Sequence, residues 1–289
     1  MIPTCDLHAH SHFSDGSVSP AELASLARKA GLAAVALCDH NTVAGLGEFF
    51  SACKKQGVEA VAGIEFSVDY APRDVPVELH LLALGLEEKN FVPIGKKLEE
   101  ALREKEKSNL LLMQNLQKVG IALTYEEIRA ASRDRQVNRA VIGSHMVKKG
   151  YVSSVKEAFD RYLDIKCGHF VPPRRLDVYE TLDFIRAQGA ISVLAHPLLN
   201  LSEEELEVFL PKATAHGLVG MEVYYSKFTP AQREYLAGLC RRHNILPSGG
   251  SDFHGENKPG IHLGTGRGDL CVPYGLWQAL KVAKPENLL

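Results

Sequence analysis

Residues 5–16 read "CDLHAHSHFSDG", and these twelve positions hold three histidines and two aspartates close to the start of the chain. One residue separates His8 from His10, so on an extended strand their side chains point to the same face and can reach the same metal ion. Asp15 follows in a turn beside Gly16. The stretch therefore predicts a strand that ends in a metal-binding cluster, with further ligands elsewhere in the chain.

Further short apolar runs alternate with helical patterns along most of the chain. These runs span residues 33–39, 58–66, 77–85, 190–197, 218–225 and 244–252. Such alternation is typical of βα units around a mainly parallel sheet. The first helix is well marked, because Ser19 can cap it, Pro20 takes its first position and Glu22 completes a capping box. The pattern predicts an α/β fold.

Residues 91–165 have a different pattern. The segment "KKLEEALREKEKSNLLLMQNLQKVG" reads as a long amphipathic helix, and further helical patterns follow to about Tyr162. Apolar residues recur at helical spacing at Leu98, Leu102, Leu110, Met113 and Leu116. We expect residues 91–165 to form a helical insertion between two parts of one α/β domain, residues 1–90 and 166–289.

Composition limits the possible partners of the protein. With 33 Lys+Arg and 35 Asp+Glu the net charge is -2, so no overall basic field is present to hold a long nucleic acid. The six cysteines form no CxxC pair, which argues against a thiolate zinc site and a disulfide framework. The start lacks a signal-peptide pattern and no apolar run approaches about 20 residues, so we expect a cytoplasmic protein without membrane contact. Nothing in the sequence indicates the oligomeric state.

More histidines and acids fall at the ends of the later apolar runs. With the three donors of the opening stretch, the set is His8, His10, Asp15, His40, Glu65, His80, His196, Asp252 and His254. A single strand-end histidine is usually structural, but so many imidazoles and carboxylates brought together need a positive charge to satisfy them. Nitrogen and oxygen donors without sulfur suit manganese, zinc or iron, and bridging carboxylates suit a cluster of two or three ions.

Other polar residues near this set have less definite roles. His12 lies one turn beyond the HxH pair and is a candidate substrate contact, with solvent exposure as the alternative. Asp6 and Asp39 neighbour predicted ligands, and each either orients an imidazole or forms hydrogen bonds at a strand end. The remaining histidines, expected on the surface or at helix caps, are His145, His169, His216, His243 and His262.

The motifs HxH, SDG, DH, GxE, a strand histidine, AHP and SDxH occur in this order, and the sequence thereby resembles the PHP (polymerase and histidinol phosphatase) family. It is most similar to the bacterial 3',5'-nucleoside bisphosphate phosphatases and 5'-to-3' RNA exonucleases, which carry a helical insertion in the same place. The resemblance implies a distorted (β/α)7 barrel with three divalent ions at its carboxyl face, manganese first and zinc or iron as alternatives. It also implies that the nine residues named above are the metal ligands.

The activity implied is hydrolysis of phosphate monoesters, with a small nucleotide or a short RNA end as the substrate. Metal ions lower the pKa of bound water and neutralise phosphoryl charge, so we expect a metal-bridging hydroxide to attack in line. His196, Asp252 and His254 are the predicted catalytic residues. His196 is the candidate to protonate the leaving oxygen.

Binding of a second phosphate would favour a planar guanidinium. The family's usual "GRPH" segment before "GYV" reads "VNRAVIGSHMVKKGYV" here, which keeps Arg139 but places Ala140 and Val141 after it. Arg139 and the preceding Asn138 are therefore predicted substrate-binding residues, with a surface role as the alternative for the arginine. Weaker candidates of the same kind are Arg135, Lys166 and Arg174.

Three other functions remain open from the sequence. Histidinol phosphatase would use the same chemistry on a smaller monoester, and the insertion with Arg139 argues against it. An amidohydrolase-type C–N hydrolase also begins with HxH, but such enzymes often use a modified strand lysine, which is missing here. A non-catalytic relative would have lost ligands, whereas every motif position is filled in this chain.

Overall fold

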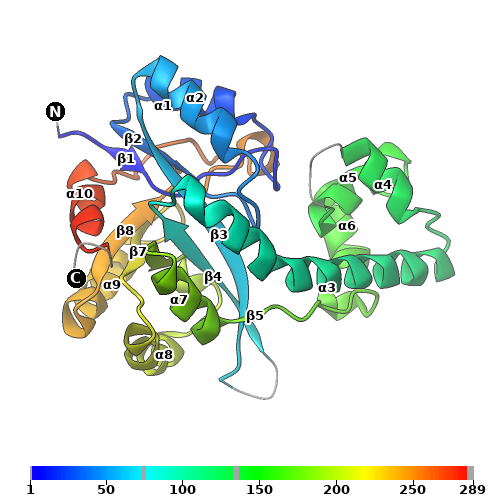
Figure 1. Ribbon diagram of the computed structural model, residues 1–289. Helices are drawn as coiled ribbons and strands as arrows, with labels where there is room; N and C mark the ends of the chain where they lie inside the picture. The colour runs from blue at the N-terminus through cyan, green and yellow to red at the C-terminus, as the bar shows by residue number, and fades with distance from the viewer. Residues whose placement is uncertain (1, 73–75, 133–136, 285–289) are drawn as a thin grey trace. The chain divides into compact units, whose positions relative to one another are not determined.

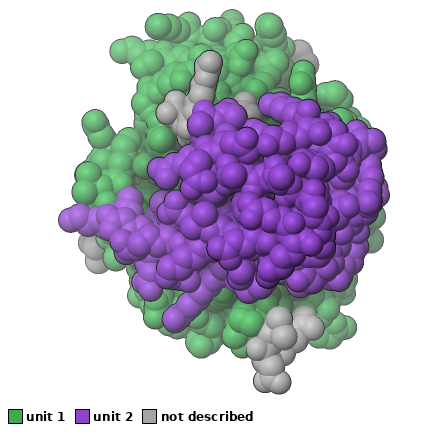
Figure 2. Space-filling model, turned by 90° about the vertical axis from the view of Figure 1, so that its right-hand side faces the viewer, with its two compact units in different colours: residues 1–94, 176–289 green, residues 95–175 purple. Residues whose placement is uncertain are grey.

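The computed structural model describes residues 2–72, 76–132 and 137–284. The chain forms two compact units, which are coloured separately in Figure 2. The first comprises residues 1–94 and 176–289, and the second comprises residues 95–175. These boundaries lie 4 and 10 residues beyond those expected from the sequence, at 90 and 165.

The first unit contains a nearly closed barrel of seven strands. In spatial order these are β1 (Cys5–Asp6), β2 (Ala34–Leu37), β3 (Glu59–Tyr70), β4 (Val77–Leu84), β6 (Ile191–Leu194), β7 (Gly220–Tyr225) and β8 (Leu246–Gly250), with β5 (Leu176–Asp177) paired to β3. Backbone hydrogen bonds close the ring, since Leu7 N–H donates to Gly249 and Asp252 N–H donates to the carbonyl of His8. The predicted distorted barrel is confirmed.

One strand runs against the others. β4 is antiparallel to both β3 and β6, whereas the remaining neighbours on the ring are parallel. Only residues 71–76 connect β3 to β4, and a parallel neighbour would need a crossover of a dozen or more residues. The expectation of a mainly parallel sheet holds for the other strands, and the short connection explains the exception.

The longer helices of the first unit lie on the outside of the sheet (Figure 1). They are α1 (Pro20–Lys29), α2 (Leu46–Gln56), α7 (Val178–Ala187), α8 (Glu203–Ala215), α9 (Pro230–His243) and α10 (Tyr274–Val282). The predicted capping box is present, because Ser19 accepts from the N–H of Glu22 and the Glu22 carboxylate accepts from the N–H of Ser19. Trp277 and Leu280 of α10 belong to one core with buried strand residues such as Ala36.

The second unit is helical and has its own core. It contains most of α3 (Phe91–Lys118), together with α4 (Tyr125–Ser132), α5 (Arg139–Lys148) and α6 (Val155–Ala158). Short helical segments of the chain span Glu88–Asn90, Phe159–Leu163, Ile165–Cys167, Pro197–Leu199 and Gly255–Asn257. Among the described helices, none combines the length and hydropathy needed to cross a bilayer.

The buried face of α3 differs in one place from the predicted stripe. Met113 and Leu116 are buried as predicted, but Leu110 is 38% exposed and Leu112 is fully buried in its place. Leu112, Met113 and Leu116 stand at positions i, i+1 and i+4, which lie on one side of a helix. Leu110 lies on the other side.

A carboxylate on β3 ties α10 to the barrel. Glu59 accepts hydrogen bonds from Trp277 Nε1 at 2.8 Å, from Lys281 Nζ at 2.9 Å and from the hydroxyl of Tyr274. Partial burial by itself raises the pKa of Glu59, but these hydrogen bonds, that from Tyr274 first, bring the pKa below its ordinary value. Because the folded pKa is the lower one, the stabilisation is present above the unfolded pKa and is lost as the pH falls through the folded value.

We therefore predict that Glu59→Gln lowers the free energy of unfolding by about 1 kcal/mol at pH 7, a modest value because the site is partly exposed. The difference from wild type should shrink as the pH falls below about 4. Thermal unfolding in metal-free buffer measures it. The exposed Glu234 of α9 supplies the control Glu234→Gln, and a Glu59→Gln deficit that is independent of pH would contradict the prediction.

Candidate metal centre

The nine predicted donors lie together at one end of the barrel. Among the described residues, four groups of these side chains have possible ligand atoms within 4.8 Å of one another, and the groups share members. They are His10, Asp15, His40 and His254; His8, His10 and Asp252; His8, Glu65 and His196; and His40, Glu65 and His80. The shared members join the four groups into one cluster.

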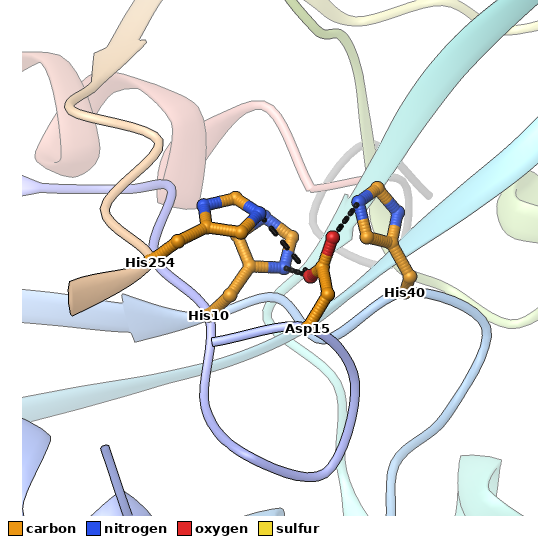
Figure 3. A group of neighbouring side chains, drawn as sticks. All are labelled: His10, Asp15, His40 and His254. Atoms are coloured by element: carbon orange, nitrogen blue, oxygen red, sulfur yellow. Dashed lines mark ion pairs between the residues drawn. The ribbon is translucent and has the colours of Figure 1, made fainter. Parts of the chain in front are cut away.

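Asp15 is the centre of the group drawn in Figure 3. Its Oδ1 lies 3.1 Å from His254 Nε2 and 3.8 Å from His10 Nδ1, and its Oδ2 lies 3.7 Å from His40 Nε2. These four side chains come from segments following β1, β2 and β8. Strands far apart in the sequence therefore supply one set of donors, because their ends meet at the same rim of the barrel.

Glu65 of β3 is a buried carboxylate surrounded by five imidazoles. The residue is fully buried, so imidazole rings rather than water molecules surround its carboxylate. His8 Nε2, His10 Nε2 and His40 Nδ1 lie 3.1, 3.1 and 3.2 Å from Oε2, and His80 Nδ1 and His196 Nε2 lie 2.8 and 3.1 Å from Oε1. A carboxylate with donors beside both oxygens is suited to bridge two cations.

The number of imidazoles exceeds what the carboxylates can satisfy. The buried Nδ1 atoms of His10 and His196 have no hydrogen-bond partner among the described residues, and those of His40 and His80 lie beside Glu65 without forming a hydrogen bond. His8 Nε2 and His10 Nε2 lie only 3.0 Å apart. Unpaired buried nitrogens are costly, and a divalent cation would coordinate them. The site therefore fits metal ions held by nitrogen and oxygen donors.

Electrostatics inside the cluster divide the imidazoles into two kinds. Burial by itself lowers the pKa of each ring, and for His40 burial prevails and lowers the pKa to about 3. Against the same effect, Asp252 and Glu65 raise the pKa of His10 to about 9, and Glu65 raises that of His80 to about 10. The rings cannot all be protonated, so positive charge from bound cations suits the site better than further protons.

The carboxylates keep their charge despite burial. Burial raises the pKa of Asp15, Glu65 and Asp252, but their neighbours outweigh it and hold all three pKa values well below the ordinary range. The surrounding imidazoles have this effect on Asp15 and Glu65, and Lys258 is the largest such influence on Asp252. Ionised carboxylates are the form that binds cations.

Two residues of the cluster have a left-handed backbone. His196 has φ +30° and Asp252 has φ +57°, a region that side chains with Cβ atoms rarely adopt. Such strain persists only where the surroundings hold it. Asp252 is held by Tyr225 Oη and Lys258 Nζ, which donate to its Oδ2 at 2.9 and 2.7 Å.

Glu222 of β7 belongs to the site, although it was not among the predicted residues. It is fully buried, its Oε1 lies 2.9 Å from His8 Nδ1, and its Oε2 accepts the N–H of His196 at 2.7 Å. It thereby fixes the ring of His8 with Nε2 facing Glu65, as carboxylates commonly do for metal-bound histidines. The available signal was a charged residue inside the apolar run at 218–225, where burial requires a partner.

Asp6 and Asp39 both form strand-end hydrogen bonds. Asp6 accepts from the N–H groups of His8, Ser251 and Gly264, which anchors the loop after β8 to β1. Asp39 accepts from the N–H and hydroxyl of Ser11 and from the hydroxyl of Ser14. Of the two alternatives left open by the sequence, these contacts favour the hydrogen-bonding one.

The predicted substrate residues have contacts of their own. The ring of His12 stacks on Phe13 with centroids 4.8 Å apart, and Asn138 caps α5 by accepting the N–H of Val141. In the second unit, Arg139 lies 4.2 Å above the ring of Phe170 and donates to the carbonyl of Leu163 at 3.2 Å. Binding of substrate by these three residues stays a prediction. Of the weaker candidates, Lys166 lies near Asp164, Arg174 is exposed, and Arg135 lies outside the described residues.

Comparison with known proteins agrees with this geometry. Residues 6–165 match the PHP domain. A 5'-3' exoribonuclease of Haemophilus influenzae is 34% identical over 255 residues, covering 88% of this chain and 91% of that protein. A 3',5'-nucleoside bisphosphate phosphatase of Chromobacterium violaceum is 26% identical over 290 residues, covering 98% and 99%. In three dimensions the chain is similar to a Bifidobacterium adolescentis protein assigned as a metal-dependent phosphoesterase, with a TM-score of 0.83, 26% identity and coverage of 98% and 96%.

The chain therefore belongs to the PHP family. It is a metal-dependent phosphoesterase of that family, with the complete set of expected donors gathered at one end of its barrel.

We predict that His10→Ala reduces both the metal content and the turnover of the purified protein. His10 is shared by two of the donor groups, so its loss disturbs more than one cation. Elemental analysis after dialysis measures the metal. The exposed His262, which lies outside the donor groups, supplies the control His262→Ala. Full metal stoichiometry in His10→Ala would remove His10 from the ligand set.

A second prediction concerns Glu222. Glu222→Gln should weaken metal affinity about 10- to 100-fold, because the amide loses the charge that holds His8. Titration against a competing chelator measures the affinity. Unchanged affinity in a variant that folds normally would mean that Glu222 only fills space in the barrel.

Proposed function

We propose that this protein removes the 3'-phosphate from nucleoside 3',5'-bisphosphates, and that short RNA degraded from its 5' end is a second substrate of the same centre. The observation that carries the proposal is the convergence of nine nitrogen and oxygen donors on one buried cluster. The relatives from Chromobacterium violaceum and Haemophilus influenzae are named for these two activities. The first reaction cleaves a phosphate monoester and the second a phosphodiester, and both require attack on an anionic phosphorus centre.

The chemistry required is hydrolysis of an anionic ester. Its negative charge repels a nucleophile, and water at neutral pH is itself a poor one. Divalent ions, when bound, lower the pKa of water and neutralise charge on the phosphoryl oxygens. We propose that the nine donors hold three such ions, with Mn²⁺ first and Zn²⁺ or Fe²⁺ as alternatives.

Three residues are proposed to act directly in the reaction. His196 is the candidate to supply a proton to the leaving oxygen, since its Nε2 lies beside Glu65 while its Nδ1 has no hydrogen-bond partner among the described residues. Asp252 Oδ1 lies 3.5 Å from His10 Nε2 and 3.4 Å from His254 Nδ1. Asp252 and His254 would therefore help to hold the ions beside the reacting phosphate. Asp252 is itself fixed through Oδ2, which accepts hydrogen bonds from Tyr225 and Lys258.

A panel of substrates tests the proposal. The Mn²⁺-loaded enzyme is assayed on adenosine 3',5'-bisphosphate, 5'-AMP, histidinol phosphate and a 5'-phosphorylated tetranucleotide, with chelator-treated enzyme as the control. We expect phosphate release from the bisphosphate to leave 5'-AMP and to exceed release from the two monophosphates. Preference for histidinol phosphate would instead support the alternative phosphatase, and failure on every ester would refute phosphoesterase activity.

Arg139 is proposed to bind the second phosphate from the insertion. If so, Arg139→Ala raises KM for the bisphosphate about tenfold or more while raising KM for p-nitrophenyl phosphate much less. Thermal unfolding is measured alongside, because the guanidinium also packs on Phe170. An equal change in both KM values would limit Arg139 to a structural role.

A further inference from the structure

Three basic side chains come from segments that meet beside Asp252, and only Lys258 contacts it. Lys258 donates to Asp252 Oδ2 at 2.7 Å, and its side chain is 36% exposed. Lys227 lies two residues after Tyr225, whose hydroxyl donates to the same oxygen at 2.9 Å. The third side chain, Arg267, comes from the turn that follows these loops in the chain.

Backbone packing brings the turn of Arg267 against the loop of Lys227. Gly266 has φ +56°, and a Cβ added there would lie 2.6 Å from Ser226 Oγ, which in turn donates to the carbonyl of Ser251. Arg267 and Lys227 are the next residues along each segment. The loops after β7 and β8 and the turn at 262–268 therefore meet beside Asp252.

Two of these cations have no anionic partner in the described part of the chain. Lys227 and Arg267 are exposed and form no hydrogen bond or ion pair with another described residue, whereas the nearby Asp269 is paired with Arg233 at 3.0 Å. Burial and the charges of Lys258 and Arg267 lower the pKa of Lys227, and Asp252 acts in the opposite direction. Lys258 thus contacts the Asp252 carboxylate, which belongs to the donor cluster, and Lys227 and Arg267 add two positive charges on the segments that meet beside it.

Metal binding does not account for this arrangement. Cations in the cluster would add positive charge beside the three basic side chains and increase the repulsion. Only an anion relieves it. The substrate's reacting phosphate would be taken up by the donor cluster itself, so the basic side chains are available for a different anionic group.

We propose that Lys227, Lys258 and Arg267 form a subsite for a phosphate of the substrate that is not hydrolysed, the same phosphate for which Arg139 is a candidate. We name this set the basic rim. The inference rests on the proposed function, because the reacting phosphate must occupy the metal centre. The second phosphate comes either from a nucleoside bisphosphate or from the backbone of a short RNA, and in both cases it lies one nucleotide away from the reacting one. The basic rim would then help to distinguish such substrates from simple monoesters.

The test removes the two unpartnered cations in Lys227→Ala/Arg267→Ala. With the Mn²⁺-loaded enzyme, we expect KM for adenosine 3',5'-bisphosphate to rise by about tenfold more than KM for p-nitrophenyl phosphate. Replacement by Lys227→Arg/Arg267→Lys should restore most of the difference, because both charges remain. Equal changes in the two KM values would overturn the inference.

A matched control separates local contacts from overall charge. Lys54→Ala/Lys55→Ala removes the same two charges from the last turn of α2, which leads into the beginning of β3 and so lies away from the strand ends that carry the cluster. If this control reproduces the effect, the basic rim acts only through net charge and the subsite is refuted. Assays on a 5'-phosphorylated tetranucleotide identify the source of the phosphate: a larger effect on RNA assigns the basic rim to the backbone, and a larger effect on the bisphosphate assigns it to the mononucleotide.

Failure of the proposed function would be visible separately. If the wild-type enzyme leaves the bisphosphate intact, the proposed activity is refuted. Binding of the bisphosphate to the same Mn²⁺-loaded protein can then be measured by calorimetric titration, because the ligand is not consumed. A Kd about tenfold weaker in Lys227→Ala/Arg267→Ala than in wild type would still support the subsite. Equal Kd values, or no binding by wild type, would refute it.

Discussion

The arrangement of this site depends on a single buried carboxylate, that of Glu65. Five imidazole rings approach its two oxygens within 3.2 Å, in a place almost closed to solvent. One negative charge cannot satisfy so many nitrogens, and water cannot reach them to help. The strands therefore surround a site in which bound cations would satisfy the remaining nitrogen and oxygen atoms. The stability of the barrel end and its chemistry depend on the same contacts.

The barrel holds this cluster by placing its ligands on rigid strand ends and fixing them from behind. Glu222 locks the ring of His8 and the backbone of His196, while Tyr225 and Lys258 fix one oxygen of Asp252. The left-handed backbone at His196 and Asp252 is tolerated because these contacts hold it. Strain and buried charge are thus concentrated at the reactive end of the barrel, whereas the opposite end is closed by apolar packing against α10.

We assign substrate specificity to side chains outside the donor cluster. The donor cluster would act on one phosphate ester much as on another, since it offers ligands to metal ions and only indirectly to the rest of a substrate. The basic rim and Arg139 are where substrates with one and two phosphates would be distinguished. They come from loops and from the helical unit, which is where variation is tolerated without disturbing the strands.

Local signals in the sequence determined much of this protein: the strand and helix alternation, the Ser19 capping box, the insertion and the placement of nine donors at or near strand ends. HxH spacing and strand-end placement are properties of short segments, so the sequence alone records them. The reversed direction of β4 follows from the length of the 71–76 connection and was open to the same reasoning. Tertiary structure alone decided the partners of Glu222, the contact of Lys258 with Asp252 and the approach of Gly266 to Ser226. Each of these joins segments that only the closure of the barrel brings together, and no periodicity within either segment records the other.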